Sequence, residues 1–158
     1  MTALTLTING ETIRADVPPR LHLADFLREH CGLTGTHLGC EHGVCGACTI
    51  RLDGAIVRSC LILAVQADGS AVETIEGVSD SGEGQALQAA FAARNALQCG
   101  YCTPGMIITA LDFLATAADP TDRVAIRQHL SGNYCRCTGY EAIVDAIASV
   151  ARTHEAPP

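Results

Sequence analysis

Four cysteines in the first half of the chain have a spacing that suits iron–sulfur chemistry. Cys40, Cys45 and Cys48 follow a C-x4-C-x2-C pattern, and Cys60 comes after eleven further residues. Plant-type [2Fe-2S] sites take this form, in which a short loop wraps three thiolates around one side of the cluster. Glycines in such a loop allow positive φ, so that backbone amides can point at a negatively charged cluster. The glycines here are Gly39, Gly43 and Gly46.

A second set of four cysteines lies in the other half of the chain. Cys99 and Cys102 form a C-x2-C pair, and Cys135 and Cys137 form a C-x-C pair after a long gap. Four thiolates also suit structural zinc, and this alternative stays open on spacing alone. Disulfides are disfavoured in a reducing compartment. The two sets use eight of the nine cysteines, and we interpret the remaining Cys31 as a small buried apolar residue.

The histidines do not extend either set. Cys40 and His42 form half of a Rieske pattern, but Cys45 and Cys48 are followed by no second histidine at that spacing. The other histidines lack partners at ligand spacing and are interpreted as surface or capping residues; they are His22, His30, His37, His129 and His154. No Ser-His-Asp arrangement, phosphate-binding loop or G-x-G-x-x-G fingerprint is found. The pattern indicates electron transfer without substrate chemistry on this chain.

Charge and hydropathy exclude several classes of partner. The 158 residues carry a formal charge of −7, and the ten basic residues are all arginines with no basic run. Binding to nucleic acid or to an anionic membrane surface is therefore not expected. No apolar stretch reaches the roughly 18 residues of a membrane span, and residues 1–8 lack the pattern of a secretory leader. We expect a cytoplasmic protein whose grouped cysteines bind metal.

Alternating apolar residues and turn signals predict a small α+β unit around the first cysteine set. Asn9-Gly10 and Asp53-Gly54 each lie between two predicted strands and are typical of hairpin turns. The second hairpin begins after Cys48 and ends at Cys60, so it would set the distance between these two ligands. The expected elements are strands at 4–8, 13–17, 49–52, 56–59 and 71–75, a helix at 22–31 ended by Gly32, and either strand or short helix at 61–68.

The second half of the chain carries helical signals. Residues 78–85 are rich in glycine and have little to bury, so we expect them to link a domain at 1–77 to a domain at 86–158. Thr103 and Pro104 suit the N-cap and first position of a helix. Each pair of helices carries two cysteines at its turn, so antiparallel packing would bring four sulfurs to one end of a bundle. The expected helices are at 86–97, 103–118, 123–131 and 140–152.

Three motifs, in order, resemble those of a known family. They are Gly39-Cys40-x4-Cys45-Gly46-Ala47-Cys48, Gln98-Cys99-Gly100-Tyr101-Cys102-Thr103-Pro104-Gly105 and Asn133-Tyr134-Cys135-Arg136-Cys137-Thr138-Gly139-Tyr140. Over nearly its full length the chain resembles the small iron–sulfur subunit of the molybdenum hydroxylases, the group that contains xanthine dehydrogenase, aldehyde oxidoreductase and aerobic carbon monoxide dehydrogenase. The resemblance implies an α+β fold, with an N-terminal β-grasp, ferredoxin-like domain and a C-terminal four-helix domain. It also implies a second [2Fe-2S] cluster in place of zinc.

The same resemblance implies partners and an electron route. In the family a large subunit holds a molybdenum–pterin cofactor and a medium subunit holds FAD, in a heterotrimer or a dimer of heterotrimers. Gln98, through its side-chain amide, and Cys137 are similar to the positions that contact the pterin. Electrons would pass from molybdenum to a cluster on one cysteine set, then to a cluster on the other, then to FAD. The two sets, in that order, are Cys99, Cys102, Cys135 and Cys137, and Cys40, Cys45, Cys48 and Cys60.

We therefore expect the electron-transfer subunit of a molybdenum-containing oxidoreductase that, as the resemblance implies, hydroxylates its substrate with oxygen from water. We also expect Ile107, Ile108 and the turn at 99–104 to face the molybdenum subunit. Two alternatives are a stand-alone ferredoxin-type carrier and a non-enzymatic iron–sulfur regulatory module. A lone ferredoxin would need only something like the first 77 residues, and the helical domain argues against it.

Overall fold

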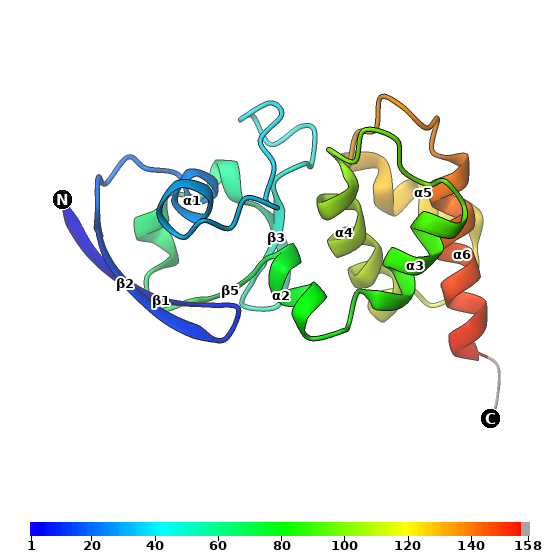
Figure 1. Cartoon of the computed structure of the whole chain (residues 1–158), viewed down its shortest axis with the longest axis horizontal. Helices are drawn as coiled ribbons and strands as arrows, with labels where there is room; N and C mark the ends of the chain where they lie inside the picture. Colours follow the sequence, from blue (N-terminus) through cyan, green and yellow to red (C-terminus); the bar gives the residue numbers. More distant parts are fainter. Residues whose placement is uncertain (156–158) are drawn as a thin grey trace.

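The chain folds into a sheet lobe and a helical lobe that lie side by side along the long axis of the molecule (Figure 1). The computed structural model describes the backbone of residues 1–155 and the side chains of residues 1–153. The side chain of His154, interpreted above as an ordinary surface histidine, lies outside the described residues. The expected order of an α+β unit followed by a helical unit is confirmed.

The sheet lobe contains both predicted hairpins. Strand β1 (Thr2–Ile8) pairs antiparallel with β2 (Glu11–Val17), and β3 (Thr49–Leu52) pairs antiparallel with β4 (Ala55–Arg58). Strand β5 (Ala71–Glu73) lies between the hairpins, parallel to β1 and antiparallel to β3, in the order β2-β1-β5-β3-β4. Both turns use left-handed backbone, which Asn, Asp and Gly adopt most readily; the φ angles are 50° at Asn9, 87° at Gly10, 49° at Asp53 and 83° at Gly54.

One helix packs on the sheet and closes the first core. Helix α1 (Leu23–Asp25) continues as a π-helical turn, η1 (Phe26–His30), and together they correspond to the helix expected at 22–31. Their apolar side chains join those of the strands in one buried cluster, which includes Leu4, Leu6, Ile8, Leu23, Phe26, Leu27, Ile50 and Val72. For residues 61–68 the sequence left strand and short helix as alternatives. The structure has short 3-10 turns in this region, η2 (Ser59–Leu61) and η3 (Ala64–Ala67).

The segment expected to link the two domains, residues 78–85, begins within a helix. Strand β5 ends at Glu73, and helix α2 (Ile75–Asp80) follows it directly. Gly77 allows this helix to approach the first hairpin turn, because a Cβ there would lie 2.4 Å from Asn9 Oδ1. Val78 is buried in the helical core, so α2 is anchored to both lobes. The glycine-rich composition concealed a helix that tertiary contacts stabilise; where the domain boundary falls remains a prediction.

The helical lobe contains the four expected helices with shifted ends. They are α3 (Gln85–Ala93), α4 (Thr103–Thr116), α5 (Arg123–His129) with a 3-10 turn η4 (Leu130–Gly132), and α6 (Glu141–Glu155). Helix α3 ends four residues early because Asn95 adopts a left-handed conformation with φ 53°. Cys102, and not Thr103, occupies the N-cap of α4, and its side chain makes no capping hydrogen bond.

Helix α4 lies between the sheet lobe and the rest of the bundle (Figure 1). It packs on β3 on one side and on α5 on the other, so its apolar residues are covered within this chain. Ile107 and Ile108 are only 3% and 1% exposed. The expectation that these two side chains face a partner subunit is therefore wrong. They belong to the core because the helix is covered on both sides.

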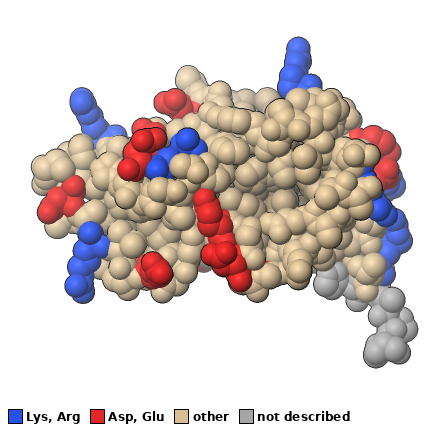
Figure 2. Space-filling view, in the orientation of Figure 1, with Lys and Arg blue, Asp and Glu red and all other residues tan. Residues whose placement is uncertain are grey.

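The surface agrees with the charge pattern of the sequence. On the face shown in Figure 2, most arginines lie apart from one another, and the basic side chains that run along the right edge lie beside acidic ones. Within the described part of the chain, no helix combines the length and apolar character needed to cross a lipid bilayer.

Candidate metal centres

The first cysteine set gathers at the open end of the β3–β4 hairpin. Cys48 directly precedes β3, and Cys60 lies in the turn that follows β4. Ser59 ties the two ends together, since its backbone N–H and its hydroxyl both donate to Cys48 O, at 3.2 Å and 2.8 Å. The hairpin thus brings Cys48 and Cys60 together, as its turn signal predicted. Cys40 and Cys45 come from the preceding loop and interact with each other.

Backbone amides in this loop point at sulfur. The N–H groups of His42 and Cys45 donate to Cys40 Sγ at 3.3 Å and 3.4 Å. These amides lower the pKa of Cys40 to about 6, because they stabilise the thiolate. The left-handed conformations that aim them occur at Glu41, Gly43 and Gly46, with φ of 54°, 74° and 74°.

The other sulfurs of this set lie in a less polar environment. Burial raises the pKa of Cys45, and burial followed by contact with Cys48 raises the pKa of Cys60 to about 11. These thiols stay protonated at neutral pH unless a metal displaces the proton. The loop therefore combines one thiolate stabilised by amides with thiols that a metal would deprotonate.

The second set lies at one end of the helical lobe. Cys99 and Cys102 occupy the turn between α3 and α4, and Cys135 and Cys137 occupy the turn before α6. The two turns bring Cys99 Sγ within 3.6 Å of Cys137 Sγ, while Cys102 interacts with Cys135. Cys99 and Cys137 are exposed, and the other two are partly buried. The predicted convergence of four sulfurs at one end of the bundle is thus observed.

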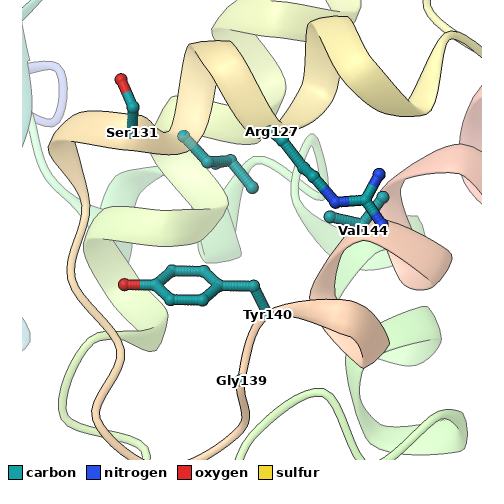
Figure 3. A pocket seen from close by; sticks show the side chains of 6 residues that line it. Arg127, Ser131, Gly139, Tyr140 and Val144 are labelled. Carbon is teal, nitrogen blue, oxygen red and sulfur yellow. The ribbon is translucent and has the colours of Figure 1, made fainter.

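The thiols of the second set also differ in pKa, because burial and hydrogen bonds act on them to different extents. Burial raises the pKa of Cys102 to about 12. Burial acts in the same direction on Cys135, but hydrogen bonds from Thr138, Cys137 and Cys102 together outweigh it and lower the pKa of Cys135. The hydroxyl and amide of Thr138 lie 3.1 Å and 3.4 Å from the sulfur. Tyr140 supports the turn from behind, since its hydroxyl accepts the Cys135 N–H at 2.9 Å. Figure 3 shows its ring between Ser131 and Val144, where it lines a cavity together with residues of α5, η4 and α6. The volume of this cavity is about 300 Å³.

The sulfurs of both sets interact in pairs. In the first set Cys40 pairs with Cys45 and Cys48 with Cys60. In the second set Cys99 pairs with Cys137 and Cys102 with Cys135. A [2Fe-2S] cluster takes four such protein ligands across its two irons. The paired sulfurs and their amide donors fit two-iron clusters.

The two candidate sites are connected through backbone. The N–H of Tyr134, next to Cys135, donates to Cys45 O at 2.8 Å. Gly46 lies against the turn that contains Gly132, and a Cβ on Gly46 would be 2.4 Å from Gly132 O. Gly105, in the first turn of α4, is equally close, since its Cβ would be 2.4 Å from Gly46 O. We call this contact region, formed by Gly46, Thr49, Arg58, Gly105, Thr109, Gly132 and Asn133, the inter-site seam.

Some of these residues were missed by reasoning from the sequence. Asn133 was part of a motif, but its burial and its bonds to Gly46 O and Thr49 Oγ1 had no sequence signal. His37 was interpreted as an ordinary histidine, yet its ring stacks on Tyr101 with centroids 4.5 Å apart. Tyr101 also donates its hydroxyl to Leu38 O at 2.7 Å. Such contacts join residues 63 or more positions apart, and no local pattern encodes them.

The remaining candidates lie as follows. Gln98 is exposed, and its Nε2 donates to Cys137 O at 3.1 Å, so the two predicted pterin-contacting residues are neighbours. Cys31 lies apart from both sets and packs against the core of the sheet lobe. Burial raises the pKa of Cys31.

Comparison with known proteins assigns both halves of the chain. Residues 6–77 match a 2Fe-2S iron-sulfur cluster binding domain, and residues 74–148 match a [2Fe-2S] binding domain. The fold and its two cysteine sites thus define an iron–sulfur protein with two [2Fe-2S] binding domains. Iron in place of zinc at the second site, expected from the resemblance, is confirmed.

Relatives place the chain in a family. It is 53% identical to caffeine dehydrogenase subunit gamma of Pseudomonas sp. (strain CBB1), covering 96% of this chain and 92% of that protein. It is 51% identical to the nicotine 6-hydroxylase small subunit of Paenarthrobacter nicotinovorans, covering 91% and 86%. Among solved structures, quinoline 2-oxidoreductase from Pseudomonas putida 86 superposes with a TM-score of 0.87 at 53% identity, covering 98% of both chains.

The chain belongs to the small [2Fe-2S] subunits of the molybdenum hydroxylases. It is an iron–sulfur electron-transfer subunit of a molybdenum-containing oxidoreductase made of several subunits.

Proposed function

We propose that the eight paired cysteines are the cluster ligands. Cys40, Cys45, Cys48 and Cys60 would hold the first cluster, and Cys99, Cys102, Cys135 and Cys137 the second. The support is the convergence of each set, with amide N–H groups donating to Cys40 Sγ, Cys99 Sγ and Cys135 Sγ. When bound, the clusters would supply one-electron transfer.

The proposed partners are a large subunit with the molybdenum–pterin cofactor and a medium subunit with FAD, in a heterotrimer or a dimer of heterotrimers. The proposed route runs from the molybdenum–pterin centre to the site of the second set, then to the site of the first, then to FAD. The solvent exposure of the second set supports the first step of this route, from the pterin to that set. Cys99 and Cys137 are exposed, and Gln98 lies beside Cys137. The role proposed for Gln98 and Cys137 is contact with the pterin.

The observation that carries this function is the backbone connection between the two sites. The hydrogen bond from Tyr134 N–H to Cys45 O joins a proposed ligand of the first cluster to the neighbour of a proposed ligand of the second. Tunnelling through bonded atoms and one short hydrogen bond is more effective than through space. The inter-site seam beside this connection is buried, since Thr49, Thr109 and Asn133 are each at most 2% exposed.

The relatives also suggest a substrate class and a compartment. The similar proteins are named for caffeine, nicotine and quinoline, which are nitrogen heterocycles. We propose such a compound as the substrate of the complex, bound by the molybdenum subunit. A cytoplasmic location is proposed because grouped cysteines that bind metal suit a reducing compartment.

The direct test is EPR of the dithionite-reduced complex together with iron and molybdenum analysis. We expect two distinguishable [2Fe-2S] signals, about four irons per small subunit and molybdenum in a larger partner. One signal accompanied by zinc would contradict the assignment of the second cysteine set.

A further inference from the structure

Arg58 is a partly buried arginine whose hydrogen-bond partners are all uncharged. Its Nη1 donates to Thr49 Oγ1 at 2.6 Å, and its Nη2 donates to Gly132 O at 2.9 Å and to Asn133 Oδ1 at 3.2 Å. Among the described side chains, the ion pairs within 4.0 Å involve other basic residues, and no carboxylate pairs with Arg58. Within the described part of the chain, this cation therefore has no carboxylate oxygen within 4.0 Å as a counter-charge.

Arg51, on the same hairpin, is a partly buried arginine that does have carboxylate partners. It lies on β3, with its side chain 15% exposed, and it pairs with Glu73 at 2.6 Å and with Glu83 at 2.7 Å. Removing a guanidinium from water is costly unless an opposite charge compensates for it. Arg51 meets that requirement with two carboxylates from this chain, and Arg58 does not.

The position of Arg58 indicates where its counter-charge comes from. Arg58 lies two residues before Cys60, and its partner Thr49 directly follows Cys48. Its other side-chain partner, Asn133, lies two residues before Cys135. The guanidinium is thereby anchored to segments that carry proposed ligands of both clusters. A [2Fe-2S] cluster with four thiolates is anionic, and it gains one further negative charge when it accepts an electron.

We propose that Arg58 is a counter-charge shared by the two clusters and that its guanidinium raises their reduction potentials, most strongly for the first cluster. The added electron strengthens the attraction to a nearby cation, so the reduced form gains more than the oxidised form. The effect is larger at the first site because both Arg58 and Thr49 adjoin its ligands. Arg58 acts through this field and holds no ligand itself. This inference rests on the ligand sets proposed above.

The experiment is a potentiometric titration of the purified complex, followed by EPR, for Arg58→Gln, Arg58→Lys and Arg51→Gln. At the wild-type midpoint of the first cluster, we expect Arg58→Gln to lower the reduced-to-oxidised ratio by about tenfold, which is about 59 mV for one electron. Arg58→Lys keeps the charge and should restore most of the ratio. Arg51→Gln removes an equal charge from the same hairpin and should leave both midpoints unchanged.

Iron content and EPR line shape separate this electrostatic role from a structural one. If Arg58→Gln retains both signals and its midpoints equal those of the wild type, the inference is overturned. Should Arg58→Gln not accumulate, Arg58→Met keeps the aliphatic stem and receives the same titration, with unchanged midpoints again overturning the proposal. A wild-type complex without two [2Fe-2S] signals would instead contradict the proposed ligand sets and this inference together.

Discussion

At the scale of single residues, the chemistry depends on sulfurs whose surroundings differ. Amides polarise Cys40 and Cys135, whereas burial raises the pKa of Cys60 and Cys102. Cys31 shares the thiol but lies apart from both sets, so it serves as a matched control.

Replacing one proposed ligand should remove one cluster and spare the other. We expect Cys60→Ser to abolish one of the two EPR signals and to halve the iron content, since serine is a poor cluster ligand. Cys31→Ala should retain both signals. Loss of neither signal in Cys60→Ser would contradict its assignment as a ligand.

The Arg51–Glu83 pair predicts a small pH-dependent contribution to stability. Contact with Arg51 lowers the pKa of Glu83 in the folded protein, so its contribution is present above the unfolded value of about 4.3 and is lost as pH falls through the lower folded value. Glu83→Gln should lower the free energy of unfolding at pH 7 by less than about 1 kcal/mol, because the carboxylate is partly exposed. Thermal unfolding at several pH values should show this difference hold above about pH 4.3 and shrink as pH falls below that value, with exposed Glu11→Gln as the control.

At the scale of elements, the close approach of three backbone segments positions the two sites. The Cys45–Cys48 loop, the first turn of α4 and the turn after α5 meet at Gly46, Gly105 and Gly132. A side chain at Gly105 would meet backbone oxygen, which cannot rotate away. The separation of the sites is therefore sensitive to a single methyl group.

Gly105→Ala should reverse the usual effect of this substitution in a helix. Alanine normally stabilises a helix interior by about 1 kcal/mol relative to glycine. Here the added Cβ would lie 2.4 Å from Gly46 O, and we expect a loss of about 1–3 kcal/mol. Thermal unfolding of the complex measures stability, and EPR of the reduced protein should show weaker magnetic coupling between the clusters. A more stable variant with unchanged coupling would contradict this account of the seam.

At the scale of the whole molecule, the two lobes form a connected unit through buried polar groups. Asn133 is 2% exposed, donates to Gly46 O and Thr49 Oγ1, and accepts from Thr109 and Arg58. Helix α2 adds a second connection, since Val78 lies in the helical core while Gly77 contacts Asn9. The lobes should therefore unfold together.

Removing the Asn133 side chain should uncouple the lobes. Asn133→Ala removes four hydrogen bonds of the inter-site seam. The groups that it bonds to keep other partners, so we expect a cost of about 0.5–1.5 kcal/mol for each lost bond. We expect calorimetry to resolve two transitions in the variant and one in the wild type. Gln128→Ala, on the exposed side of α5, should retain the single transition. A single unshifted transition in Asn133→Ala would show that the seam does not couple the lobes.

The sequence by itself determined most of the elements and the two cysteine sets, because these depend on local spacing. Asn9-Gly10 and Asp53-Gly54 encode their turns through left-handed φ, and cysteines at the ends of short loops converge once those loops close. Only the tertiary structure decided the rest. It showed that α2 is a helix, that Ile107 and Ile108 are core, and that Arg58 and Asn133 join the two sites. These features arise from contacts between segments tens of residues apart, where packing and buried hydrogen bonds override local preference.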